Sequence, residues 1–172
     1  MKEKLLQKNT VFGLNLKFDA LVLYSLYLLS VLIPLLIGKP QFLVGSIVNF
    51  LITYSKLKYK VVKTVPILLL PSITATATGI LFNGATHFLL YVMPFIMISN
   101  LILSLFVNKR KNISYVVGIL LKGGFLLVAY YIMNVVIGLP RVFLLSVNLQ
   151  FVTAAIGVLS AVMLYNIENK KN

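Results

Sequence analysis

The stretch that decides the fold runs from Thr86 to Ile137 and reads THFLLYVMPFIMISNLILSLFVNKRKNISYVVGILLKGGFLLVAYYIMNVVI. It contains two apolar runs, residues 86–107 and 113–137, and each is long enough to cross a bilayer, which takes about 20 residues of helix. The polar turn between them, residues 108–112, holds three consecutive basic residues. Because clusters of Lys and Arg mark the cytoplasmic ends of membrane helices, this stretch predicts a hairpin that enters and leaves a membrane.

The rest of the chain repeats this alternation, with further apolar runs at about residues 20–37, 41–55, 61–82 and 142–166. Of the 172 residues, 60% are hydrophobic and only 11% are charged, whereas a soluble domain carries about 25% charged residues. We therefore predict an all-α polytopic membrane protein with a single domain over residues 1–172, a bundle of six transmembrane helices. The short loops predict that consecutive helices are antiparallel neighbours.

The distribution of basic residues predicts the orientation. The chain has 16 Lys and Arg against 3 acidic residues. Nearly all of the basic residues lie before the first helix, in the second-to-third and fourth-to-fifth loops, or at the C-terminal end; Lys39 and Arg141 lie on the other side. Since the Lys-rich side is cytoplasmic, we expect both termini in the cytoplasm and a multi-pass protein of the plasma membrane. Basic clusters between apolar runs contact lipid headgroups, and they do not indicate nucleic acid as a partner.

The inventory of reactive side chains is small. The chain has no Cys, one His and three acidic residues. A catalytic serine site needs a histidine that meets the serine, and catalytic metals need clusters of acids or histidines. No phosphate-binding glycine loop is present. We therefore predict that the protein is not an enzyme and holds no metal and no cofactor.

Polar side chains inside the predicted helices are candidates for a binding site, because at membrane depth they normally face the interior of the bundle. Ser46, Asn49 and Thr53 share one face of the second helix. The third helix contains PSITATATG at residues 71–79. Its hydroxyls either serve close helix packing, or the stretch is partly unwound and lines a cavity. The candidate substrate-binding residues are Gln41, Asn49, Ser72, Thr74, Thr76, Asn83, His87, Lys122 and Asn134.

Lys122 is the most unusual of these candidates, because it lies about 14 Å along the fifth predicted helix at ~1.5 Å per residue. An ammonium at such depth costs at least about 2.5 kcal/mol. We expect it either to snorkel toward the cytoplasm or to face the bundle, as a counter-charge for an anionic ligand or as a contact to a partner subunit. Gly123 and Gly124 beside it would let another backbone approach. For Asn49, Asn134 and His87, a purely structural role is the alternative.

The prolines, glycines and asparagines of the first four helices follow an ordered pattern. The chain carries, in sequence, Pro40-Gln41, Gly45, Asn49, Leu70-Pro71-Ser72, Gly79, Met93-Pro94-Phe95 and Ser99-Asn100. In this order, over about residues 34–107, it resembles the S-component-like proteins of prokaryotic energy-coupling factor transporters. The resemblance implies a six-helix subunit that binds a vitamin or similar small organic solute near the outer face. It also implies two kinds of partner, a membrane coupling subunit and cytoplasmic ATPases.

The first helix departs from that family. Characterised members carry an Ala-x-x-x-Ala pattern that docks the coupling subunit. Here the residue four positions after Ala20 is Tyr24, and the residue four positions after Ser25 is Leu29. The family's metal-binding branch uses an extracellular N-terminal site, which a cytoplasmic, Lys-rich N-terminus does not provide, so an organic solute is the expected ligand. The alternative function is an accessory or scaffold membrane protein whose polar residues only satisfy one another.

Overall fold

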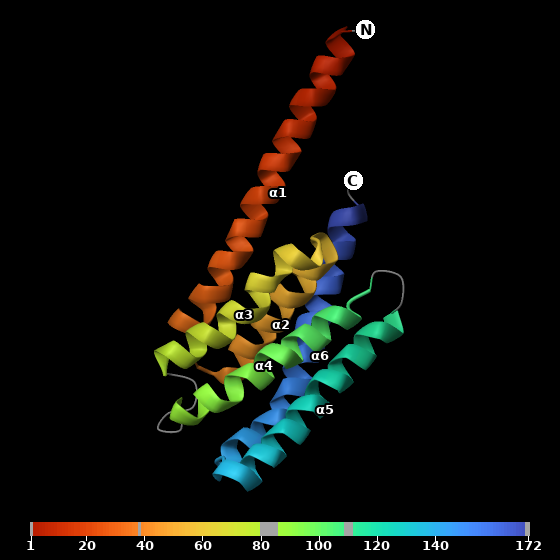
Figure 1. The fold of residues 1–172 in the computed structure, drawn as a ribbon. Coiled ribbons are helices and arrows are strands. Elements are labelled where there is room, and N and C mark those ends of the chain that lie inside the picture. The colour runs from red at the N-terminus through yellow and green to blue at the C-terminus, as the bar shows by residue number, and fades with distance from the viewer. Residues whose placement is uncertain (1, 38, 80–85, 109–111, 171–172) are drawn as a thin grey trace.

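The computed structural model describes residues 2–37, 39–79, 86–108 and 112–170, and it confirms the all-α prediction (Figure 1). Side chains are described from Phe18 onward, and that of Thr86 is not. The helices are α1 (Lys2–Leu36), α2 (Gln41–Lys58), α3 (Val61–Thr78), α4 (Thr86–Phe106), α5 (Asn112–Ile137) and α6 (Arg141–Lys170).

The helices extend beyond several of the predicted apolar runs. α1 begins at Lys2, well before the apolar run that starts at residue 20, and α6 continues to Lys170. Hydropathy locates the part of a helix that suits lipid, whereas backbone hydrogen bonding continues through polar residues. α3 is helical without interruption to Thr78 and ends at Gly79, whose φ of 72° is left-handed. The expectation that residues 71–79 are partly unwound is therefore wrong.

Five of the helices are long and apolar enough to cross a membrane, and α2 is the one that falls below that measure. Its sequence is broken by Asn49 and ends with Lys56 and Lys58. α2 is also extensively enclosed by its neighbours, since nine of its 18 residues are buried. A helix shielded from lipid by other helices does not need to be apolar on every face, which explains how α2 accommodates Ser46, Asn49 and Thr53.

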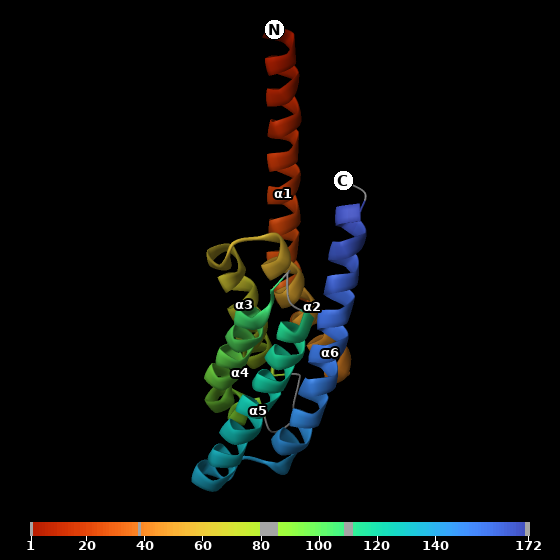
Figure 2. The same ribbon diagram turned by 90° about the vertical axis from the view of Figure 1, so that its right-hand side faces the viewer.

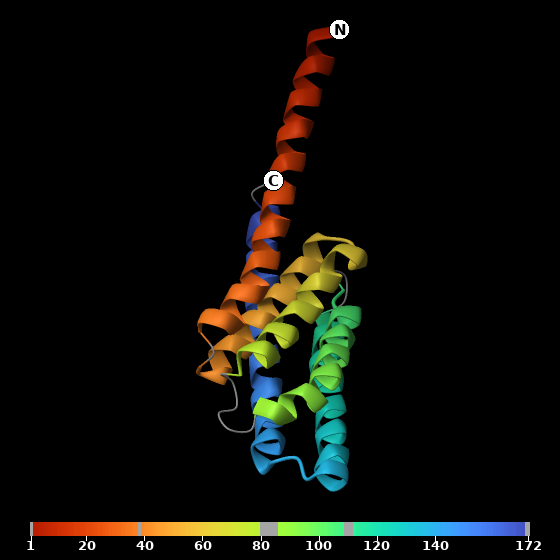
Figure 3. The same ribbon diagram turned by 60° about the vertical axis from the view of Figure 1, so that its left-hand side comes forward.

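The six helices pack as a closed ring in the order α1, α3, α4, α5, α6, α2. All consecutive helices are in contact, as the short loops predict. α2 also touches α3 and α4, so it leans toward the middle of the ring. Figures 2 and 3 show both termini at one end of the bundle and the α5–α6 turn at the other. The ring order brings together residues that are far apart in sequence.

Two hydrophobic clusters fill the bundle, one at each end. The cluster nearer the termini contains Leu51, Ile67, Leu103 and Val158. The other cluster, nearer the α5–α6 turn, contains Leu89, Leu126, Phe143 and Val147. On α4, α5 and α6, the buried polar residues Asn100, Lys122 and Thr153 lie between the levels of these two clusters.

The closest helix pair is α2 with α6, and Gly157 makes this approach possible. A Cβ atom at Gly157 would lie 2.6 Å from both the backbone N of Phe50 and the backbone O of Ser46. Because these atoms belong to the α2 backbone, they cannot move aside without shifting the helix. The absent side chain is therefore what sets the distance between α2 and α6.

We expect Gly157→Ala to lower the free energy of unfolding by about 1–3 kcal/mol, the usual cost of overpacking a tight core. Thermal unfolding of the detergent-purified protein measures this. Gly124→Ala is the matched control, because nothing lies within 4 Å of a Cβ there. It should be neutral or raise stability by up to about 1 kcal/mol through helix propensity. Equal melting temperatures for the two variants would contradict the close α2–α6 packing.

Candidate functional site: a buried lysine beneath a cavity

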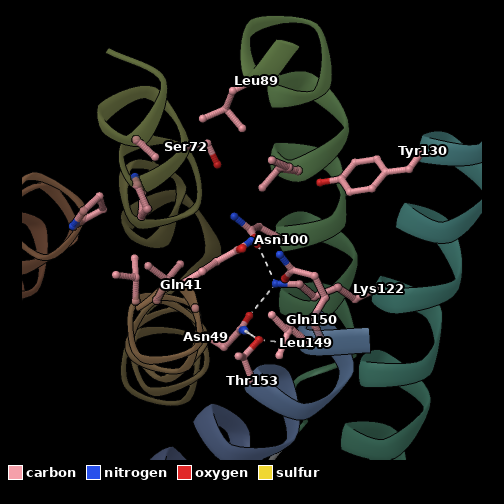
Figure 4. Close-up of a pocket in the computed structure, with 17 residues that line it drawn as sticks. Gln41, Asn49, Ser72, Leu89, Asn100, Lys122, Tyr130, Leu149, Gln150 and Thr153 are labelled. Carbon is pink, nitrogen blue, oxygen red and sulfur yellow. Dashed lines mark hydrogen bonds between the residues drawn. The ribbon is translucent and has the colours of Figure 1, made fainter. Parts of the chain in front are cut away.

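Lys122 points into the bundle from α5. The residue is 2% exposed, so the expectation that it snorkels to the cytoplasmic surface is wrong, and the side chain faces the bundle instead. Its Nζ donates hydrogen bonds to Asn49 Oδ1 of α2 at 2.5 Å and to Asn100 Oδ1 of α4 at 2.8 Å (Figure 4). The long aliphatic stem thus carries the amino group across the interior to the facing helices.

The two glycines beside Lys122 do not bring another backbone close, contrary to the expectation from the sequence. A Cβ at Gly123 would lie 2.2 Å from the ring of Phe151, so this position admits an aromatic side chain of α6 and not a backbone. Gly124 has nothing within 4 Å of the corresponding point. Packing of the Phe151 ring against Gly123 holds α5 and α6 together directly beside Lys122.

The orientation of both asparagine amides follows from their other partners. Asn100 Nδ2 donates to the carbonyl oxygen of Leu68 at 3.2 Å, and a carbonyl can only accept. Asn49 Nδ2 donates to Thr153 Oγ1 at 3.4 Å, while the Thr153 hydroxyl donates to Gln150 O at 3.3 Å. Each amide nitrogen therefore faces away from Lys122, and each amide oxygen faces its Nζ.

These hydrogen bonds join five of the six helices at one level. Leu68 belongs to α3, Asn100 to α4, Lys122 to α5, Asn49 to α2 and Thr153 to α6. We call this set the lysine network. It lies between the two hydrophobic clusters, so a polar layer separates the apolar ends of the bundle.

The lysine network contains no acidic residue. Within the described side chains, the one ion pair joins Lys58 Nζ to Glu168 Oε2 at 3.4 Å, near the terminal end of the bundle. The hydroxyl of Tyr54 also donates to that carboxylate at 2.7 Å. Lys122 therefore has two neutral amide oxygens as its partners and no described counter-charge. Burying an ammonium without an opposite charge is costly, and an anion beside Lys122 would offset that cost.

A cavity of about 80 Å³ adjoins the lysine network. Lys122, Asn49, Asn100 and Thr153 form its floor, at the level between the two clusters. The cavity extends from there toward the α5–α6 turn, that is, toward the end opposite the termini. A single water needs roughly 10–15 Å³ by this kind of measure, so the space suits several waters or one compact organic group.

The walls of the cavity are apolar, and its remaining polar groups lie in two places. Apolar contacts come from Val44, Val48, Ala75, Leu89 and Ile96. Gln41 and Gln150 also line it, and both are partly exposed. The hydroxyls of Ser72 and Tyr130 line it away from the floor (Figure 4).

Ser72 and Tyr130 are largely enclosed residues of the cavity lining, and their hydroxyls have no hydrogen-bond partner among the described residues. Ser72 is 6% exposed and Tyr130 1% exposed. No hydrogen bond joins either hydroxyl to the part of the chain that the structure describes. The backbone oxygen of Ser72 accepts from Thr76 Oγ1, and the Tyr130 ring packs edge-on against Phe143 at 6.0 Å between centroids. Since buried hydroxyls normally find a partner, these two groups are available to whatever enters the cavity.

Four of the nine candidate residues line this cavity: Gln41, Asn49, Ser72 and Lys122. The cavity is lined by residues of α2 to α6 and by Pro34 of α1.

The other candidates lie elsewhere. Thr74 and Thr76 do not line the cavity, and Thr76 bonds its own helix, which favours the packing alternative for that stretch. His87 is exposed, with its ring 4.2 Å from that of Phe88. Asn134 Nδ2 donates to Leu139 O and so stabilises the α5–α6 turn. Asn83 lies outside the described residues.

The candidate set lacks Asn100, Thr153, Gln150 and Tyr130. Asn100 carries the same signal as Asn49, an amide within an apolar run. Gln150 and Thr153 are three residues apart on α6 and share one face, which is a detectable signal. Tyr130 carries none, because tyrosine is common both in membrane cores and at membrane interfaces.

Comparison of the chain with models of protein families, with curated proteins and with solved structures found no match. The resemblance to S-component-like proteins therefore gains no support from known relatives, and it stays a prediction.

Proposed function

We propose that this protein is the substrate-capturing subunit of a multi-component importer for a small organic solute, with six membrane-crossing helices and both termini in the cytoplasm. The observation that carries the proposal is the buried Lys122, which has no acidic partner among the described residues and forms the floor of a cavity. Convergent polar groups within apolar walls are typical of small-molecule sites in helical bundles. The sequence holds no nucleotide-binding loop, so separate coupling and ATPase subunits would supply the energy.

The position of the cavity supports capture from outside the cell. Gln41, Leu89 and Tyr130, which line the part of the cavity away from its floor, lie in the half of the bundle opposite the termini. The basic residues gather at the terminal end, where Lys56, Lys58, Lys60 and Lys63 lie close together in sequence. By the positive-inside rule that end faces the cytoplasm. The cavity would then face the outer half of the membrane, which is where an import subunit first meets its solute.

Single cysteines test this orientation, because the natural chain has none. Arg141 and Lys170 are both exposed, at opposite ends of α6. We expect a membrane-impermeant maleimide to label Arg141→Cys in intact cells and to label Lys170→Cys only after permeabilisation. The reverse pattern would place the cavity on the cytoplasmic side and would contradict capture of an external solute.

A thermal-shift screen tests the function itself. The detergent-purified protein is heated with vitamins, vitamin precursors and small organic acids and amines. A ligand that binds only the folded state raises its stability by about 2.7 kcal/mol at a hundredfold excess over Kd. We expect a saturable shift with one compound class. No shift with any compound, from protein shown to be folded, would contradict the proposal.

The second candidate is an accessory or scaffold protein. It is favoured by the lysine network itself, in which both asparagine side chains and Thr153 have hydrogen-bond partners within the bundle and five helices are held together. A scaffold does not account for the unpartnered hydroxyls of Ser72 and Tyr130 in the cavity wall. The thermal-shift screen separates the two functions, since a scaffold gains no stability from solutes.

A further inference from the structure

We infer that the ligand of this cavity is a compact organic monocarboxylate with a second hydrogen-bonding group, held between Lys122 at one end and the hydroxyls of Ser72 and Tyr130 at the other. This inference rests on the proposed function and narrows its solute to one chemical class.

The donors at the floor favour one acidic group. An ammonium has three N–H donors, and Lys122 uses two of them on Asn49 and Asn100. The amide nitrogens of Asn49 and Asn100 each use one of their two neutral N–H donors, on Thr153 and Leu68. The floor therefore offers one remaining charged N–H. A carboxylate oxygen fits this donor, and such charge-assisted bonds are roughly twice as strong as neutral ones.

Charge and geometry favour a carboxylate over a phosphate. A phosphate monoester carries about −1.5 to −2 at neutral pH and presents three acceptor oxygens. Proteins meet it with arginine forks, glycine loops or helix N-termini. Among the described residues that line the cavity, Lys122 is the one basic residue and none is an arginine. One positive charge is balanced by one carboxylate, whereas a dianion would bring a net negative charge into the bundle.

The end of the cavity away from Lys122 favours a second polar group on the ligand. Tyr130 follows Lys122 by two turns of α5, about 12 Å of helix rise, and its hydroxyl is directed into the cavity (Figure 4). Ser72 contributes a hydroxyl from α3 on the same side. Each can donate and accept one hydrogen bond. A hydroxyl, keto or amide group on the ligand would satisfy both, and a purely aliphatic acid would leave them unpaired.

The middle of the ligand is apolar and small. Val44, Val48, Leu89 and Ile96 line the space between the two polar ends. With a volume of about 80 Å³, the cavity in this form does not suit bulky cofactors or long acyl chains.

Matched acid and amide pairs test the anion. A panel of hydroxy-, keto- and amide-bearing monocarboxylates is compared with the corresponding carboxamides and with phosphate monoesters by thermal shift. We expect at least one acid to bind, with its carboxamide weaker by about 100-fold, since loss of a buried charged partner has effects of this size. Amides that bind as tightly as their acids, or phosphate esters that bind best, would overturn the inference while leaving solute capture intact. Absence of binding by every compound would instead contradict the proposed function.

Two sets of variants assign the ends of the ligand. Tyr130→Phe and Ser72→Ala should each weaken the best acid by about three- to tenfold, as expected for one neutral hydrogen bond. Tyr131→Phe is the control, because Tyr131 is 64% exposed on the outer surface, and it should leave the affinity for the acid unchanged.

Asn49→Asp places a carboxylate beside Lys122, while the Thr153 hydroxyl can turn to donate to it. We expect a folded protein that no longer binds the acid, and undiminished binding would overturn the assignment of Lys122.

Discussion

Lys122→Met should abolish ligand-dependent stabilisation, with a loss of affinity of about 100-fold or more. Removing one partner of a desolvated charged contact costs about 2–5 kcal/mol, and each tenfold change in Kd corresponds to about 1.4 kcal/mol. Methionine keeps much of the length and volume of the lysine stem, so the aliphatic packing of α5 is retained. The measurement is a thermal-shift titration with the best compound of the screen, for both proteins under the same conditions.

The control for this substitution is Lys60→Met, which removes an exposed lysine at the terminal end of the bundle. It changes the net charge by the same amount without touching the cavity, so ligand affinity should stay as it is. An unchanged affinity in Lys122→Met would show that the ligand does not contact the buried amino group, and the proposed site would then be wrong.

Asn100→Leu should destabilise the ligand-free protein by about 3 kcal/mol. The substitution removes an acceptor at 2.8 Å from Lys122 Nζ and leaves the ammonium with Asn49 as its described partner. Leaving a buried charge less well paired costs about 3–5 kcal/mol in comparable sites. Thermal or denaturant unfolding in detergent measures the change, with Asn134→Leu as a comparison at an amide that bonds only the α5–α6 turn.

A double substitution separates the burial of charge from the packing of the leucine. If the cost of Asn100→Leu arises from the ammonium, then adding Lys122→Met removes that cost, and the double variant should be more stable than Asn100→Leu alone. Such coupling is the difference that a double-mutant cycle isolates. Additive losses in the double variant would mean that Lys122 and Asn100 act independently.

The helices could be predicted because apolar runs and basic loops are local properties of the sequence. The limits of α1 and α6 could not, since a helix continues through polar residues beyond the apolar run. The ring order of the helices depends on which surfaces fit, for example the contact of Gly157 with the α2 backbone. Neither the hydropathy of the sequence nor the spacing of its residues indicates that contact.

The candidate site was predictable where a polar residue is costly at membrane depth. Lys122 is an isolated charge in an apolar helix, Asn49 belongs to the polar face of α2, and both lie at the floor of the cavity. Thr74 and Thr76 misled the prediction because a threonine hydroxyl can be satisfied by its own helix. Tyr130 could not be recognised, since only the packing shows that its hydroxyl lines the cavity without a partner among the described residues.

Protection of a thiol inside the cavity is the most direct test of whether a ligand binds there. Val48 lines the cavity and is close in size to cysteine, so Val48→Cys places a single reactive group in its wall. Lys170→Cys, at the exposed C-terminal end of α6, is the control. We expect that saturating the protein with the best carboxylate slows alkylation of Val48→Cys by a small thiol reagent and leaves alkylation of Lys170→Cys unchanged. Equal alkylation of Val48→Cys with and without a compound that stabilises the protein would contradict a ligand in this cavity.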